Sequence, residues 1–271
     1  MSTATHQQAT RVPLPGRVTL DVLQQGDPDG IPVVLLHGLS DSWRSWELLL
    51  PHFPRSMRAI AVSQRGHGDS ERPGSGYLVR DFADDIGALL DTLGIASAVI
   101  AGHSMGSTVG RRFAADHPGR VRGLALLGSF ATFADRTDLA ELGDIARALP
   151  DPIPRDFMRE FQESTLAQPV PEAFLQLVID ESCKLPASVF AQSLAGLFGD
   201  DVASDLARIT APALILWGDH DAFCPRADQD AIGRALPGSR LSVFEGAGHA
   251  FHWEQPGRAA HELAAFVAAV S

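Results

Sequence analysis

The sequence has few cysteines and a deficit of basic residues. Only two cysteines, Cys183 and Cys224, occur in 271 residues, and they lie in separate segments. They form no metal-ligand cluster in the sequence, and their scarcity indicates a reducing compartment. The 22 Lys and Arg residues are outnumbered by 33 Asp and Glu residues, so the net charge is −11. Such an acidic chain is a poor partner for nucleic acid or an anionic membrane surface.

The first ten residues also lack any long apolar run. Residues 1–10 are polar and rich in Ser, Thr and Gln, with no stretch that could form a signal peptide or a membrane span. We therefore expect a cytoplasmic protein without membrane association and with a short frayed start.

Strand and helix patterns alternate along much of the chain. A run of 271 residues with 45% hydrophobic content is long enough for one large α/β domain, with room for a second small one. Several predicted strands are apolar throughout, which is typical of a parallel sheet covered on both faces by helices. The alternation predicts a doubly wound, mostly parallel sheet with ligands at the carboxyl ends of its strands. The predicted strands are 18–23, 31–36, 59–62, 98–101, 121–127, 213–217 and 241–244. The predicted helices that alternate with them are 77–93, 107–116 and 256–270.

The alternation stops after residue 127 and resumes only at residue 213. Between residues 129 and 205 the spacing of apolar residues predicts only helical pieces, separated by prolines. We interpret this segment as a helical insertion that forms a cap over the sheet. The predicted organisation is a core of residues 1–128 and 206–271, interrupted by a cap of residues 129–205. The predicted helices of the insertion are 139–149, 155–166, 171–185 and 187–198.

A pentapeptide, Gly102-His103-Ser104-Met105-Gly106, lies between the predicted strand 98–101 and the predicted helix 107–116. In this context G-x-S-x-G is the pattern of a nucleophile elbow, a sharp turn that exposes a serine hydroxyl. The glycines on either side of Ser104 allow the backbone to pass close to its neighbours. The free N–H groups and the dipole of the following helix favour an anionic oxygen at this point.

An activated serine needs a base, and the base needs a group to orient it. Candidates follow the last two predicted strands, where the chain reads Trp217-Gly218-Asp219-His220-Asp221 and then Gly246-Ala247-Gly248-His249. Because the strands are expected to be parallel, both loops should emerge at the same edge of the sheet as the serine.

These motifs together resemble the α/β-hydrolase fold superfamily, in its group of small hydrolases that carry a cap. The resemblance runs from His37-Gly38 through Arg65-Gly66-His67-Gly68 and the elbow to His249. It implies an eight-stranded sheet, with Ser104 as nucleophile, His249 as general base and then acid, and Asp221 as the carboxylate that fixes the imidazole. In this family the acid can instead follow the strand that corresponds to 121–127. Here the chain at that point reads Gly128-Ser129-Phe130 and has no carboxylate.

The same geometry predicts an oxyanion hole formed by the backbone N–H groups of Leu39 and Met105. Asp219 stays open as an alternative acid, and His252 as an alternative base. We expect His37, His67 and His103 to be structural, with His103 pointing away beside the serine. The family commonly has Asp where Ser63 stands and Gly where Ser107 stands, and both departures concern loop packing near the pocket.

The leading functional prediction is a serine esterase or lactonase that acts on a small, fairly apolar substrate through an acyl-Ser104 intermediate. Phe130, Phe133 and Phe161 are candidate substrate contacts, and we expect no metal and no cofactor. Haloalkane dehalogenase and epoxide hydrolase chemistry is disfavoured by Ser104 and Ser40 at positions where those enzymes carry Asp and Pro. Alternatives within the fold are a carbon–carbon bond hydrolase, a cofactor-free perhydrolase or haloperoxidase, an amidase or peptidase, and a receptor for a small ligand with little turnover. Other apolar residues considered for the pocket or the core of the cap are Phe157, Phe174, Phe190, Leu139, Leu142 and Leu177.

Overall fold

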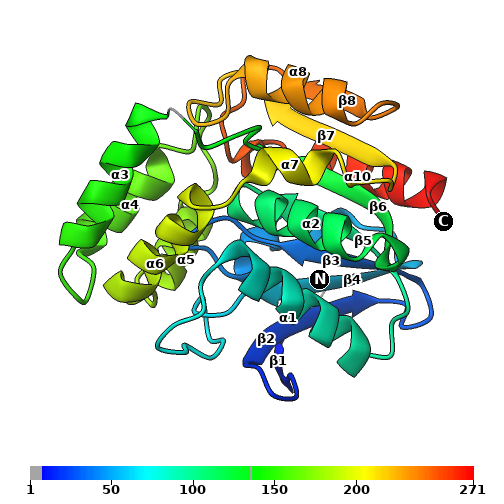
Figure 1. Ribbon diagram of the computed structural model, residues 1–271, viewed down its shortest axis with the longest axis horizontal. Coiled ribbons are helices and arrows are strands. Elements are labelled where there is room, and N and C mark those ends of the chain that lie inside the picture. Colours follow the sequence, from blue (N-terminus) through cyan, green and yellow to red (C-terminus); the bar gives the residue numbers. More distant parts are fainter. Residues whose placement is uncertain (1–7, 135) are drawn as a thin grey trace.

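The computed structural model describes residues 8–134 and 136–271, and its centre is one eight-stranded sheet (Figure 1). The strand order is β1-β2-β4-β3-β5-β6-β7-β8. β1 pairs antiparallel with β2 and β2 pairs antiparallel with β4, while all other neighbours are parallel. The predicted doubly wound, mostly parallel sheet is thus confirmed. The strands are β1 (Thr10–Pro13), β2 (Thr19–Gly26), β3 (Ile31–Leu36), β4 (Met57–Ser63), β5 (Ala98–His103), β6 (Val121–Leu127), β7 (Ala213–Gly218) and β8 (Arg240–Phe244).

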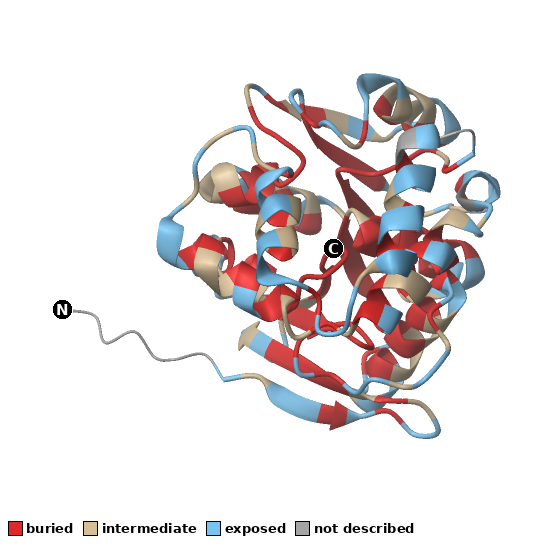
Figure 2. Cartoon of the chain, turned by 90° about the vertical axis from the view of Figure 1, so that its left-hand side faces the viewer, coloured by how far each residue is buried: buried red, intermediate tan, exposed pale blue. Residues whose placement is uncertain are grey.

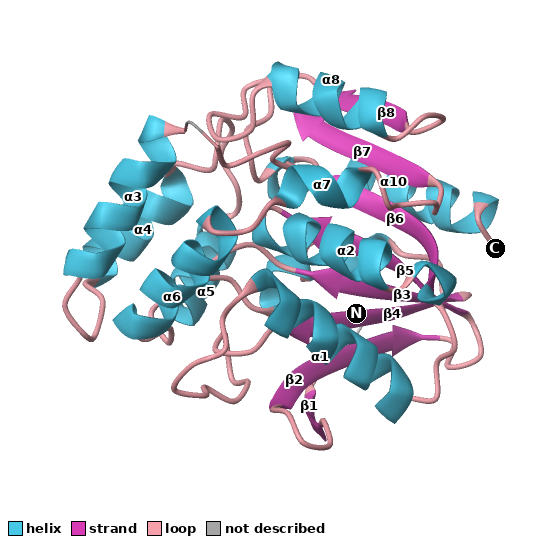
Figure 3. Ribbon diagram, in the orientation of Figure 1, coloured by secondary structure: helices cyan, strands magenta, loops and turns pink. Residues whose placement is uncertain are grey.

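Helices cover both faces of the sheet (Figure 3). Apolar residues of α1, α2 and α8 belong to one buried cluster, and those of α10 belong to another together with Phe251 of α9. The central strands therefore lie between two apolar layers, which explains why their sequences are apolar throughout. The helices outside the insertion are α1 (Val79–Thr92), α2 (Met105–Asp116), α8 (Arg226–Ala235), α9 (Phe251–Glu254) and α10 (Pro256–Ala269), with short 3₁₀ turns η1 (Trp43–Trp46), η2 (Leu50–His52) and η3 (Pro118–Arg120).

Between β6 and β7 the described residues form helices and no strand. Four of these helices lie together beyond the carboxyl ends of the parallel strands (Figure 3). Pro154, Pro171 and Pro186 immediately precede three of them, where a missing backbone N–H costs nothing. The helices of this insertion are α3 (Thr137–Ala148), α4 (Arg155–Glu163), α5 (Glu172–Ser182), α6 (Ala187–Phe198) and the short α7 (Val202–Leu206).

Buried residues are concentrated in the strands and on the inward faces of the helices (Figure 2). Phe133, Leu139 and Phe190 of the insertion join the same apolar cluster as α1 and α2. Within the residues that the structure describes, no helix is both long and apolar enough to cross a membrane.

One strand and several helices were missed by the sequence analysis, and one expectation falls partly outside the described residues. β1 was not expected, because only Val12 among its four residues is buried and the apolar signal is correspondingly short. α8 was also missed, since most of its residues are polar or exposed. Residues 1–7 of the expected frayed start lie outside the described part of the chain, and residues 10–13 belong to β1.

Candidate active site

Ser104 lies at the turn between β5 and α2, with φ 52° and ψ −116°. A positive φ is costly for a residue with a side chain, so the surrounding structure must hold it in place. A Cβ on Gly106 would come within 2.2 Å of the carbonyl oxygen of Leu36, so only glycine fits there. The Ser107 hydroxyl, at a position where the family usually has glycine, donates a hydrogen bond of 2.6 Å to the Ser104 carbonyl. The turn therefore has the strained strand-to-helix geometry of a nucleophile elbow.

His249 and Asp221 form a buried pair next to this turn. Nδ1 of His249 lies 2.8 Å from Oδ2 of Asp221. The other oxygen of Asp221 accepts backbone hydrogen bonds from Phe223 at 2.8 Å and Cys224 at 2.9 Å. A Cβ on Gly128 would lie only 3.0 Å from His249 Nδ1, so the absence of a side chain there makes room for the pair. With Nδ1 bound to the carboxylate, Nε2 is the ring nitrogen of His249 left for proton transfer.

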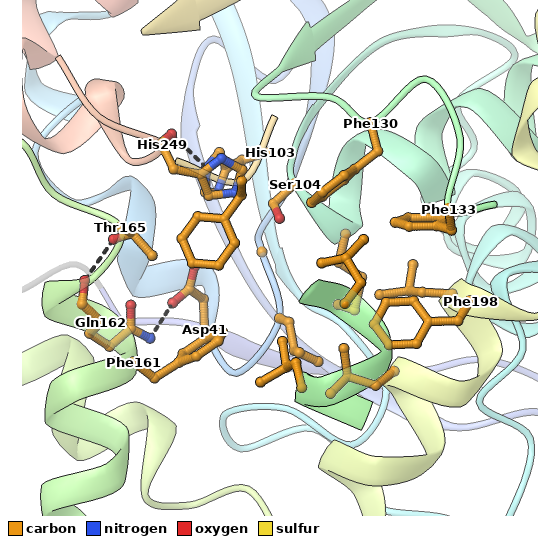
Figure 4. A pocket seen from close by; sticks show the side chains of 18 of the residues that line it. Asp41, His103, Ser104, Phe130, Phe133, Phe161, Gln162, Thr165, Phe198 and His249 are labelled. Carbon is orange, nitrogen blue, oxygen red and sulfur yellow. Dashed lines mark hydrogen bonds between the residues drawn. The ribbon is translucent and has the colours of Figure 1, made fainter. Parts of the chain in front are cut away.

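Ser104 and His249 line the same pocket (Figure 4). Their side chains are not hydrogen-bonded to each other in this structure. Catalytic hydrogen bonds of this kind often shorten only when substrate is bound. Met105 lines the pocket as the first residue of α2, where backbone N–H groups have no helical acceptor. Leu39 lines it from the loop after β3.

Much of the pocket wall is apolar. All three candidate substrate contacts, Phe130, Phe133 and Phe161, belong to it. Inside the insertion, Phe157 is stacked on Phe161 at a centroid distance of 6.5 Å, and Phe190 contacts Phe161 edge to face at 5.7 Å. The apolar lining residues contributed by segments after β6 are Phe130, Phe133, Leu139, Leu142, Phe161, Leu194, Leu197, Phe198, Phe223 and Trp253. Phe157, Phe174, Leu177 and Phe190 do not line the pocket.

The alternative acid and base lie elsewhere. Asp219 is exposed, and its carboxylate accepts a hydrogen bond of 2.6 Å from the backbone N–H of Gly246. His252 is fully buried against Trp46 and His103 and is absent from the pocket wall. His37 uses both ring nitrogens, with Nδ1 donating to the Gly38 carbonyl and Nε2 accepting from the N–H of Gln64.

The prediction that His103 points away from the site was wrong. His103 is the last residue of β5, and its buried ring lines the pocket beside the ring of His249, at a centroid distance of 4.8 Å. Its Nε2 lies 3.1 Å from the carbonyl oxygen of His249 (Figure 4). Burial lowers the pKa of His103 well below 6.5, so the ring is neutral and Nε2–H donates to that carbonyl. The ring therefore helps to fix the loop that carries His249.

Asp41 is a pocket residue that the sequence analysis missed. Its side chain is buried, and Oδ1 accepts a hydrogen bond of 3.0 Å from Nε2 of Gln162 on α4. Burial raises the pKa of Asp41 to about 7, although hydrogen bonds from Gln162 and Gly38 and the nearby His249 act in the opposite direction. The only signal in the sequence was a carboxylate three residues after Gly38.

Asp221, Cys224 and His249 form a group whose possible ligand atoms lie within 4.8 Å of one another. The expectation that neither cysteine takes part in such a group is therefore corrected for Cys224. Its thiol donates to the carbonyl of Gly128 at 3.2 Å, and burial raises its pKa well above 9. Cysteine binds metal as a thiolate, and both oxygens of Asp221 already accept hydrogen bonds, so these donors fit proton chemistry better than metal binding.

Comparison with known proteins identifies the family of this chain. The family described as alpha/beta hydrolase fold matches residues 31–256. The AB hydrolase superfamily protein YisY of Bacillus subtilis (strain 168) is 30% identical over 240 residues, which cover 83% of this chain and 87% of that protein. The pimeloyl-[acyl-carrier protein] methyl ester esterase of Neisseria meningitidis serogroup B / serotype 15 (strain H44/76) is 30% identical over 234 residues, covering 82% of this chain and 88% of that enzyme.

A solved structure agrees as well. The esterase EaEST from Exiguobacterium antarcticum matches with a TM-score of 0.86 at 26% identity, covering 96% of this chain and 99% of that one. The fold and these esterase relatives support a hydrolase. The chain belongs to the α/β-hydrolase fold superfamily.

Proposed function

We propose that this protein is a serine hydrolase that cleaves a small, fairly apolar carboxylic ester or lactone through an acyl-Ser104 intermediate. The observation that carries the proposal is the 2.8 Å contact between His249 and Asp221 beside Ser104 in one largely apolar pocket. This arrangement supplies a nucleophile, a base and a group that orients the base.

In the proposed reaction His249 Nε2 takes the proton of the Ser104 hydroxyl as Oγ attacks the carbonyl carbon. The resulting oxyanion accepts hydrogen bonds from the backbone N–H groups of Leu39 and Met105. His249 then gives the proton to the leaving alcohol oxygen, and the carbon–oxygen bond breaks. Water, deprotonated by His249, attacks the acyl-serine, and collapse of the second intermediate releases the acid and returns the proton to Ser104. Asp221 holds Nδ1–H throughout and stabilises the imidazolium.

We propose that the insertion of residues 129–205 acts as the cap of this site. Phe133, Phe161 and Phe198 supply apolar surface at its inner side. Such a surface binds an acyl chain and keeps bulk water from the acyl-enzyme. The chemistry uses protein groups alone, so the proposal includes neither a metal nor a cofactor.

The names of the relatives support an ester as the substrate class. The Neisseria meningitidis protein is described as a methyl ester esterase, and the Exiguobacterium antarcticum structure as an esterase. Both descriptions concern those proteins. From these names we propose only that the cleaved bond is an ester bond; the acyl group has to be determined by experiment.

The test is a stopped-flow measurement with p-nitrophenyl butyrate, followed by acid quench and mass analysis of the peptide that contains Ser104. The proposal predicts turnover and a transient butyryl group on that peptide, which is missing in Ser104→Ala. Turnover with no acyl group on Ser104 would contradict the mechanism. A protein that cleaves no ester and no lactone but cleaves a vinylogous diketone would be a carbon–carbon bond hydrolase, and one that binds without cleaving would be a receptor.

A further inference from the structure

The pocket has two chemically different ends, and Ser104 lies between them (Figure 4). Phe130, Phe133 and Phe198 line one end. Asp41, Gln162 and Thr165 line the other, where Phe161 lies beside them (Figure 4). In Figure 4 the ring of His249 lies toward the polar end. Cap packing accounts for the phenylalanines, but a buried carboxylic acid in a substrate pocket needs a separate explanation.

Gln162 holds the Asp41 carboxyl in place. Nε2 of Gln162 lies 3.0 Å from Asp41 Oδ1, 3.2 Å from the hydroxyl oxygen of Ser40 and 2.8 Å from that of Ser182. All four side chains are buried. Because Ser40 and Asp41 follow β3 while the other two residues belong to α4 and α5, the network joins the sheet to the insertion. The carboxyl is thereby fixed from the side of the insertion by Gln162, and a backbone hydrogen bond from Gly38 also reaches it.

The second oxygen of Asp41 and Nδ1 of His103 both lie close against the backbone of Gly38. A Cβ built on Gly38 would lie 3.1 Å from Asp41 Oδ2 and 3.0 Å from His103 Nδ1. Among the described residues, Nδ1 of His103 has no hydrogen-bond partner. Since Nε2–H of this neutral ring donates to the His249 carbonyl, Nδ1 carries a lone pair and accepts. Nδ1 of His103 has almost no accessible surface, so the buried carboxyl of Asp41 is the group that this end of the pocket offers to a ligand.

We propose that this polar end is a subsite for a hydroxyl group on the alcohol part of the substrate, so that the preferred ester is that of a short alcohol with a second hydroxyl. This inference rests on the proposed function. His249 must protonate the leaving alcohol, so the alcohol part lies on the His249 side of Ser104, which is the polar side. The longer apolar acyl chain then occupies the end with the phenylalanines.

A hydroxyl suits this subsite better than a charged group. It can donate to the ionised carboxylate of Asp41 or accept from the protonated carboxyl. With a pKa of about 7, the Asp41 carboxyl is present in both protonation states near neutral pH, and a hydroxyl matches either one. An ammonium would pair only with the ionised form, a carboxylate only with the protonated form, and each would lose its hydration.

The experiment compares kcat/KM for 2-hydroxyethyl hexanoate and propyl hexanoate, which have the same acyl group and alcohol parts of equal heavy-atom count. The wild-type protein should prefer the hydroxylated ester by about tenfold, the size of one well-formed hydrogen bond. Asp41→Ala should reduce this ratio to about one. Asp69→Ala, which removes an exposed carboxylate paired with Lys184 at 3.0 Å, should keep the wild-type ratio. A wild-type ratio of one overturns the inference, whether or not the variants fold.

A separate reaction with an alkyl fluorophosphonate, read by mass analysis of the Ser104 peptide, tests the proposed function itself. No labelling of Ser104 counts against the nucleophile. Labelling together with equal kcat/KM values for the two esters counts only against the hydroxyl subsite. If Ser104 is labelled and neither ester is cleaved, both esters are compared as competitors of labelling, and equal protection overturns the inference.

Discussion

Asp221 is fixed by the backbone on one oxygen and by His249 on the other. Oδ1 accepts from the N–H groups of Phe223 and Cys224, and Oδ2 lies 2.8 Å from His249 Nδ1. The carboxylate is thus oriented before any substrate binds. Its position beside His249 distinguishes it from Asp219, which contacts Gly246 on the exposed side of the same loop.

Asp221→Asn should lower kcat by roughly 10³- to 10⁴-fold, because an amide donor at this point favours the wrong tautomer of His249. The shape of the side chain is kept, so the melting temperature serves as the check on folding. Asp219→Asn is the matched control and should change kcat by less than about threefold. If the two variants exchanged these effects, Asp219 would be the acid.

Phe133→Ala should narrow the preference for long acyl chains. Phe133 packs at a tilted angle against Phe130 at 5.0 Å and Phe198 at 5.7 Å between ring centroids, and all three rings line the pocket. Each methylene that loses its apolar contact costs about 0.8 kcal/mol, so the ratio of kcat/KM between an octanoate and an acetate ester should fall by about tenfold or more. Phe157→Ala is the control, because Phe157 packs inside the insertion outside the pocket wall. Equal ratios in the wild type and Phe133→Ala would assign Phe133 to the core of the cap alone.

His252→Phe should make the protein more resistant to acid. Burial lowers the pKa of His252 to about 3, and among the described residues neither ring nitrogen has a hydrogen-bond partner. The unfolded chain binds a proton here below pH 6.5 while the folded chain does not, so stability present above pH 6.5 is lost as pH falls toward 3. At pH 5.0 this titration lowers the free energy of unfolding by about 2 kcal/mol. Phenylalanine binds no proton, so the variant does not lose this stability.

The measurement for His252 is urea unfolding of both proteins at pH 7.5 and pH 5.0. Relative to the wild type, the variant should gain about 2 kcal/mol in the free energy of unfolding between the two pH values. Acid also lowers the free energy of unfolding through His67, whose pKa is lowered by burial, and raises it through Asp41, whose pKa is raised. Both residues are present in the wild type and in the variant, so their contributions cancel when the two proteins are compared. If the free energies of unfolding of the two proteins differ by the same amount at both pH values, His252 is not held neutral by burial.

The sequence predicted best those features that depend on local patterns. The elbow around Ser104 was recognisable because the strand, the glycines and the helix are contiguous. The proximity of the loops that carry Asp221 and His249 followed from the parallel strands that precede them. Neither inference required knowledge of distant packing.

The features that sequence reasoning missed depend on distant contacts. Asp41 resembles any loop carboxylate until Gln162, 121 residues away, is packed against it. The orientation of His103 is set by the carbonyl of His249, 146 residues away. Similarly, Cys224 contacts Gly128 across the ends of β6 and β7, a proximity that spacing along the chain does not reveal.

The most direct test of the account is the activity of Ser104→Ala on p-nitrophenyl butyrate at neutral pH, with circular dichroism as the check on folding. The account predicts a loss of roughly a millionfold in kcat, because the remaining members of a triad cannot act without the nucleophile. Ser107→Ala, which removes a hydroxyl hydrogen-bonded to the Ser104 carbonyl at 2.6 Å, is a comparison for general disturbance of the elbow. A folded Ser104→Ala protein that keeps most of the wild-type activity would contradict the central claim.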